Sequence, residues 1–147
     1  MSGLEVSRGI AGTAVAAACL AVTVAVIAPQ AGAAATPNLS VSMSGAPIGP
    51  VKVASVGCGQ TAVASVKMAD GTPVSHGFVE FTSHLPNMGG NVVGTVPVTD
   101  GTASIFWVPG VEGTHTVSAF YFDDSSDMRP AVGQTTINAV NLNGMCV

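Results

Sequence analysis

The stretch THTVSAFYF, residues 114–122, is the longest alternating run in the chain. Successive side chains of an extended chain point to opposite faces, so one face of this run carries His115, Val117, Ala119 and Tyr121. Gly113 precedes the run and Asp123 follows it, and both residue types interrupt regular structure. The pattern therefore predicts a β-strand with one buried face.

Shorter runs of the same kind occupy the chain on both sides of this strand. Gly, Pro, Asp and Asn separate them, and beyond residue 35 we find no helical periodicity of useful length. The residues around Pro47, Gly49 and Pro50 indicate a turn-rich connection, and Gly94 with Pro97 indicates an edge strand. About seven strands are predicted, which is typical of a β-sandwich; the other six cover residues 39–43, 60–68, 77–82, 92–98, 103–107 and 134–140.

Four segments in this order resemble a bacterial immunoglobulin-like (Ig-like) repeat domain. They are DGTPV (70–74), GFVEF (77–81), VTDGTA (98–103) and GTHTVSAFY (113–121). The resemblance covers about residues 50–140, and it implies a Greek-key Ig-like sandwich that serves as a spacer or binding module on bacterial surface proteins. It also puts His115 where many Ig-like domains have a corner tyrosine, so its ring is expected to bond the nearby backbone.

The N-terminal segment differs from the rest of the chain in composition. Arg8 precedes an uncharged run rich in Ala and Val (10–28), and small residues follow Pro29. This order predicts a signal-peptide helix in residues 1–35, with cleavage near Ala33 to Ala35 and a mature domain over 36–147. The alternative is an uncleaved membrane anchor formed by residues 10–28. We expect a secreted or extracellular protein, or one anchored by that segment.

The charge balance excludes one class of partner. The sequence has four Lys and Arg against eight Asp and Glu, a net charge of −4. The cations beyond the signal segment, Lys52, Lys67 and Arg129, are scattered. A chain of this kind lacks the basic surface that nucleic acids require.

Two cysteines, Cys58 and Cys146, remain after the signal segment. Export to an oxidising compartment favours a disulfide between them over free thiols. Such a bond would hold the C-terminal tail to the start of the second predicted strand.

The sequence contains no recognisable catalytic or cofactor motif, so we expect a protein that is not an enzyme and has no cofactor. His84 and Met88, in a long loop, are the candidate ligands for Cu(I), with His76 as an unsupported third. The acidic residues 123–127 lack the spacing of a calcium loop and indicate a solvated turn.

Alternation also predicts an interaction surface. If Val79, Phe81, Val117, Ala119 and Tyr121 point inward, Phe78, Phe120 and Phe122 point outward on neighbouring strands. Exposed rings mark a protein-binding surface, unless the tail with Leu142 and Met145 covers them. The sequence thus predicts a non-catalytic secreted or cell-envelope module for protein or surface recognition, with an unknown protein or envelope ligand. The alternatives are a small extracytoplasmic copper-binding sandwich protein and a purely structural envelope component.

Overall fold

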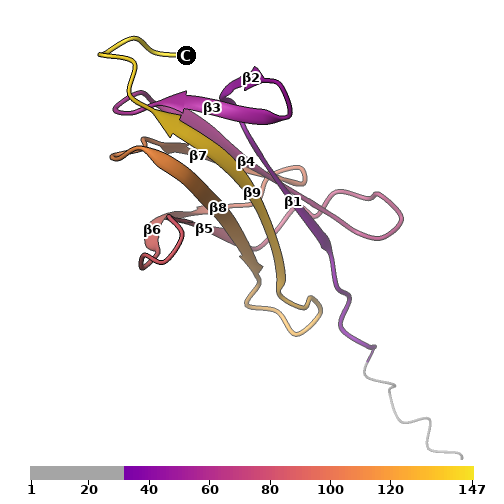
Figure 1. Ribbon diagram of the computed structural model, residues 1–147. Coiled ribbons are helices and arrows are strands. Elements are labelled where there is room, and N and C mark those ends of the chain that lie inside the picture. The colour runs from indigo at the N-terminus through magenta and orange to yellow at the C-terminus, as the bar shows by residue number, and fades with distance from the viewer. Residues whose placement is uncertain (1–31) are drawn as a thin grey trace, which may run out of the picture. The chain divides into compact units, whose positions relative to one another are not determined.

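The computed structural model describes residues 32–147, which form nine strands in two sheets (Figure 1). The predicted signal peptide, its helix and the alternative anchor lie almost entirely outside these residues. The smaller sheet has the order β1-β4-β7 and the larger sheet the order β2-β3-β9-β8-β5-β6. The strands are β1 (Asn38–Met43), β2 (Ala46–Ile48), β3 (Val51–Ser55), β4 (Gln60–Lys67), β5 (Phe78–His84), β6 (Asn91–Pro97), β7 (Thr102–Trp107), β8 (Gly113–Phe122) and β9 (Ala131–Val140).

The hydrophobic core lies between the two sheets. It is formed by the side chains that the predicted alternation directs inward. On β8 the side chains of His115, Val117, Ala119 and Tyr121 are all buried, as expected. The small residues Ala62 and Ala64 of β4 leave room for the aromatic rings that share the core. The core comprises Met43, Ala54, Ala62, Ala64, Val66, Val74, Val79, Phe81, Val98, Ala103, Trp107, Val117, Ala119, Tyr121 and Ile137.

The path of the chain between the sheets is that of an Ig-like Greek key. It leaves the smaller sheet after β4, forms β5 and β6 in the larger sheet, returns for β7, and ends with β8 and β9 in the larger sheet. All neighbouring strands are antiparallel except β3, which runs parallel to β9. This arrangement confirms the predicted all-β, Ig-like sandwich.

The prediction of a turn-rich connection around Pro47 is wrong. Residues 46–48 and 51–55 form β2 and β3, so the sandwich has nine strands where about seven were predicted. Pro47 is tolerated because β2 lies at the edge of its sheet, and Gly49 adopts a φ of 64° in the turn between the two strands. β3 pairs in parallel with a strand near the C-terminus, and no local pattern reports such a pairing.

The edge strand predicted from Gly94 and Pro97 is confirmed. β1 lies at one edge of the smaller sheet and β6 at one edge of the larger sheet. Gly94 lies opposite Phe81, beside a shift of register between Phe81 and Thr82. A bulge of this kind is common where a sheet ends.

The Cys58–Cys146 disulfide is present and joins residues 88 positions apart. Beside it, the Gln60 side-chain amide donates to the Val147 carbonyl at 2.9 Å, and the Val147 N–H donates to the Ser55 hydroxyl at 3.2 Å. The tail is therefore held near β3 and β4, at the end of β9 (Figure 1).

No helix within residues 32–147 is long and apolar enough to cross a membrane.

Candidate functional site

Three phenylalanine rings stack on the outer face of the larger sheet. Phe78 on β5 is directly opposite Phe122 on β8, with ring centroids 5.9 Å apart, and Phe120 is 6.1 Å from Phe122. The rings are outward because their neighbours Val79, Ala119 and Tyr121 are fully buried. Phe78 is 40% exposed and Phe120 41%. The structure thus brings together all three residues of the predicted surface.

Two further apolar residues extend this surface. Val132 on β9 is opposite Phe120 and 66% exposed, and Pro97 on β6 is opposite Phe78. We call Phe78, Pro97, Phe120, Phe122 and Val132 the aromatic face. Val132 was not predicted to belong to this surface because the last strand was expected to begin at residue 134, whereas β9 begins at Ala131. Residues 130–134, PAVGQ, carry no alternation of apolar and polar side chains that would have marked this start.

The surroundings of the aromatic face are mostly polar and carry few charges. Glu80 is paired with Phe120, and the next row along the sheet contains Thr82, Ser118 and Gln134 together with the exposed Val92 of β6. An apolar centre with a polar rim is the usual anatomy of a protein interface.

The C-terminal tail does not cover the aromatic face. Val132 lies at the start of β9, whereas the tail is held beyond its last residue, Val140, roughly 26 Å away along the strand. Met145 itself is exposed. The covering by Leu142 and Met145 that the sequence allowed is therefore absent from the described part of the chain.

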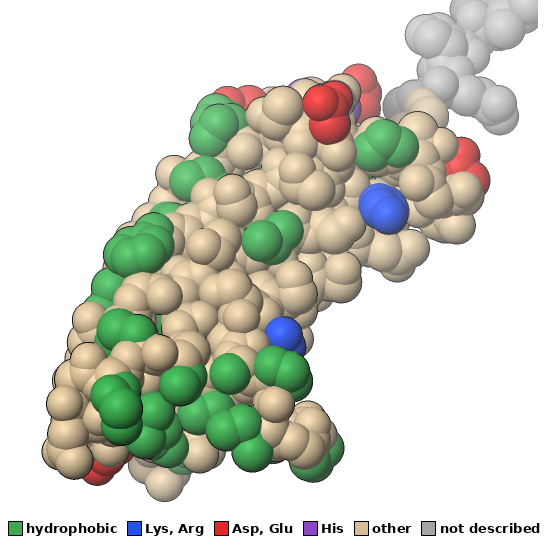
Figure 2. All heavy atoms as spheres, turned by 90° about the horizontal axis from the view of Figure 1, so that it is seen from above, with side chains coloured by type: hydrophobic (Ala, Val, Ile, Leu, Met, Phe, Trp, Pro, Cys, Tyr) green, Lys and Arg blue, Asp and Glu red, His purple; other side chains and the backbone are tan. Residues whose placement is uncertain are grey.

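Cationic side chains are isolated on the face of the molecule drawn in Figure 2. Hydrophobic side chains gather along its left and lower-left margin, whereas Lys and Arg side chains lie apart from one another. This distribution matches the scattered cations of the sequence.

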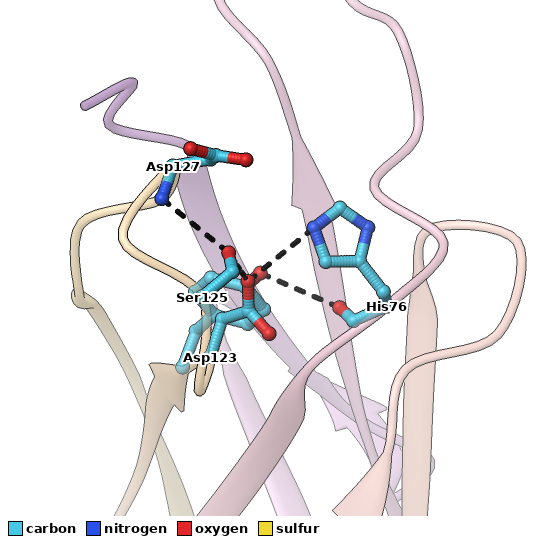
Figure 3. Close-up of polar contacts among 5 residues, drawn as sticks. His76, Asp123, Ser125 and Asp127 are labelled. Atoms are coloured by element: carbon cyan, nitrogen blue, oxygen red, sulfur yellow. Dashed lines mark hydrogen bonds and ion pairs between the residues drawn. The ribbon is translucent and has the colours of Figure 1, made fainter. Parts of the chain in front are cut away.

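The acidic loop after β8 is closed by its own side chains (Figure 3). The Ser125 hydroxyl donates to the Asp123 carboxylate, and the Asp127 N–H donates to the Ser125 hydroxyl at 3.4 Å. The hydrogen bond from Ser125, and secondarily the charge of His76 at 3.4 Å, lowers the pKa of Asp123. Within residues 32–147, no three His, Cys, Asp or Glu side chains are placed to hold a metal ion.

At the opposite end of β5 and β8 the structure has a pocket of about 450 Å³. This space, which we call the loop-end pocket, is lined by the end of β5 and the loop after it, by Asn91 and Val93 of β6, by the end of β7 and the residues after it, and by His115 of β8. Trp107 supplies a buried ring, whereas the ring of its neighbour Phe106 lies over Gly59 on the outer face of the smaller sheet. Met88 and Val111 lie at exposed positions. The pocket was not predicted because its walls come from four different strands and the loops between them.

The ring of His115 bonds the nearby backbone, as expected. Its Nε2 donates to the Val111 carbonyl at 2.9 Å, four residues upstream. Its Nδ1 lies 3.4 Å from the Ser83 hydroxyl, and the edge of Trp107 packs against the ring with centroids 5.2 Å apart. A carbonyl, not a carboxylate, orients this imidazole, so the pair lacks the anion that stabilises an imidazolium in hydrolase triads.

The copper candidates His84 and Met88 both line the loop-end pocket. His76 lies beyond the other end of β5, roughly 20 Å away, and is not part of this site. Ser83 is buried with His115 inside the sandwich, so the alternation of β5 turns the neighbouring His84 to the outer face. The two histidines of the pocket therefore belong to opposite faces of the sheet.

Neither a protein-family model nor a curated protein sequence matches this chain. Among solved structures, the Lin-41 filamin domain is similar over 68% of this chain and 91% of its own, with 20% identity and a TM-score of 0.47. The CARDB domain of PF1109 from Pyrococcus furiosus covers 72% of this chain and 97% of its own, with 17% identity and a TM-score of 0.47. The PKD domain of an M14-like peptidase from a Thermoplasmatales archaeon covers 70% and 94%, with 10% identity and a TM-score of 0.42. The assignment of residues 32–147 to the Ig-like sandwiches rests on the chain's own strand order and register.

Proposed function

We propose that this chain is an exported Ig-like module, a single copy of the bacterial Ig-like kind, that binds a protein partner through the aromatic face. The observation that carries this proposal is the stack of Phe78, Phe122 and Phe120 on the outer face of β5 and β8. No segment of residues 32–147 packs over these rings deeply enough to bury Phe78 or Phe120.

The chemistry of the aromatic face defines the partner. Rings bury large areas and dominate the energetics of protein interfaces, so a face that presents several of them gains most from a partner with apolar side chains. Glu80 is the one ionisable residue in the register around the rings, which disfavours an anionic partner. The polar row of Thr82, Ser118 and Gln134 supplies hydrogen-bonding groups at the rim.

Two features support export. The charged start, apolar run and small residues of the N-terminal segment are typical of a secretory signal. The disulfide between Cys58 and Cys146 requires an oxidising compartment to persist. The module therefore acts outside the cytoplasm, secreted or at the cell envelope, and retention of residues 10–28 would anchor it there.

The two alternatives differ in what they require. A purely structural envelope component requires no specific partner, so the aromatic face would be dispensable. A copper-binding protein requires the loop-end pocket, where His84 and Met88 meet, and would leave the aromatic face without a role.

Substitution of one ring tests the proposal. Phe120→Ser is expected to weaken retention of the native envelope partner roughly tenfold or more, because truncation of a central aromatic residue costs that much at many interfaces. The melting temperature should stay close to that of the parent, since the side chain is 41% exposed.

Ile48→Ser is the matched control. Ile48 is an exposed apolar residue on β2, outside the aromatic face and the loop-end pocket. Equal retention of the partner by the parent and Phe120→Ser would contradict the proposal, and so would an equal loss in Ile48→Ser.

A further inference from the structure

We propose that the loop-end pocket is a binding site for a small, neutral organic molecule that has an apolar body and one hydrogen-bond donor directed at Nδ1 of His115. The site is separate from the aromatic face. The pocket volume of about 450 Å³ falls in the range of cavities that hold small organic ligands.

The lining of the pocket determines the charge of the ligand. It contains no Lys, Arg, Asp or Glu, and its polar side chains are Ser83, His84, Asn91 and His115. An ion that entered this space would lose its hydration without gaining an opposite charge, which is costly. The ligand is therefore uncharged.

The proton of His115 determines which hydrogen bond the site offers. The Val111 carbonyl can only accept, so Nε2, 2.9 Å from it, carries the proton. In the neutral ring Nδ1 is then an acceptor with a lone pair in the ring plane. Its partner in the protein, the Ser83 hydroxyl, is 3.4 Å away, at the long limit for such a bond. This nitrogen has one lone pair, so a ligand O–H or N–H that makes a shorter bond to it takes the place of the Ser83 hydroxyl.

The apolar side chains of the pocket explain why the ligand should have an apolar body. Trp107 is buried against His115, whereas Met88 and Val111 are 63% and 52% exposed. An apolar molecule in the pocket would cover such surface, which is favourable in proportion to the area removed from water. Apolar walls with a small number of polar groups, here Ser83, His84, Asn91 and His115, are the usual design of a small-molecule site.

The pocket and the aromatic face cannot be one site. His115 points into the sandwich near the start of β8, whereas Phe120 and Phe122 point outward near its end. The intervening strand places the two sites roughly 20 Å apart on opposite faces of the sheet. Failure of one proposal therefore leaves the other standing.

Indole is the probe, because it is neutral and planar and has one N–H donor; 1-methylindole has the same body without the donor. We expect indole to bind the purified protein saturably, with a dissociation constant on the order of 1 mM for a ligand of that size. Proton–nitrogen correlation spectra should show shifts at the Trp107 indole N–H and at the His115 ring. 1-Methylindole should bind roughly fivefold more weakly, because one hydrogen bond is lost.

Two exposed valines provide variants that do not disturb the core. Val111→Asp places a charge at the pocket and keeps the backbone carbonyl that holds His115, so it should weaken indole binding at least fivefold. Val132→Asp places the same charge on the aromatic face and should leave the affinity unchanged. His115→Phe should abolish the preference for indole over 1-methylindole.

Three results would overturn the inference. Equal affinity of the parent for indole and 1-methylindole would show that the ligand N–H makes no hydrogen bond in the site. This comparison needs no variant. An equal response of Val111→Asp and Val132→Asp would show that binding is not at the pocket. Shifts that never saturate, or that appear only at the aromatic face, would show that indole adheres to exposed apolar surface.

Discussion

Phe78 and Phe122 lie directly opposite each other on β5 and β8, and their rings stack with centroids 5.9 Å apart. The pairing holds two large apolar side chains in fixed positions on the outside of a sheet. Cross-strand aromatic pairs stabilise a sheet modestly, on the order of 0.2–1 kcal/mol, so sheet stability alone gives little reason for three such rings at this place. The proposed recognition of a partner would account for both their number and their exposure.

The disulfide is expected to contribute substantially to stability. The Cys58→Ser/Cys146→Ser double variant should unfold at lower urea concentration, with a loss of up to roughly 4–5 kcal/mol if the 88-residue separation acts through chain entropy. Equilibrium unfolding of the parent, the reduced parent and the double variant would measure this loss. The same transition in all three would contradict the assigned role of the bond.

Export and processing can be read from the mass of the native protein. The mature chain should begin between Ala34 and Thr36 and be two hydrogens lighter before reduction. A start at Ala34 would keep the backbone bonds of Ala35 with Asp127 and Arg129, at 2.9 and 2.7 Å, which join the start of the domain to the loop after β8. A full-length mass confined to the membrane fraction would indicate an anchor instead.

Tyr121 offers a test of the core by titration, because it is the single tyrosine of the chain. Burial, and secondarily the charge of Asp123, raises its pKa above the ordinary value of 10.0. The folded state therefore holds the phenol proton more tightly, and this contribution to stability is present below pH 10.0 and lost as the pH rises through the folded pKa. Phenolate absorbance should show a higher midpoint in the folded protein than in urea.

Asp123→Asn is the control for this titration. It removes the smaller of the two causes, so the midpoint should fall but stay above that of the unfolded chain. Identical midpoints for the folded and unfolded parent would mean that the Tyr121 ring is not in the core.

Two glycines form a matched pair for the packing of the sheets. A Cβ at Gly133 on β9 would lie 2.6 Å from the Leu39 carbonyl oxygen of β1, whereas a Cβ at Gly89 would meet nothing within 4 Å. Gly133→Ala should therefore lose roughly 1–3 kcal/mol of unfolding free energy, and Gly89→Ala should change it by less than about 0.5 kcal/mol. Equal urea midpoints for the two variants would contradict the close approach of β1 and β9.

Cu(I) binding separates the copper alternative from the recognition module. We expect titration calorimetry of the purified protein to show no saturable Cu(I) site, because His84 and His115 belong to opposite faces of the sheet and His76 lies at the other end of β5. Saturable binding that Met88→Ala weakens would contradict this expectation and favour the alternative.

Local patterns predicted those parts of the fold in which one strand has one buried face. The alternation of residues 114–122 identified both the inward set of β8 and the outward Phe120 and Phe122. β2 and β3 escaped prediction because Pro47 and Pro50 resemble a loop, and the parallel partner of β3 is β9, far away in sequence. Val132 was missed with the true start of β9. The loop-end pocket was unpredictable because Ser83 and His115 meet through the pairing of β5 with β8, and Trp107 reaches them from the other sheet across the core.

Photo-crosslinking from the aromatic face tests its role most directly. A benzophenone amino acid placed at Phe120, and separately at the control position Ile48, would be activated on living cells and the products separated by mass. We expect one discrete adduct from position 120 and none from position 48. Unlabelled parent protein should compete it away, whereas unlabelled Phe120→Ser should not. The same products from both positions, or an adduct that Phe120→Ser displaces as well as the parent does, would contradict binding through the aromatic face.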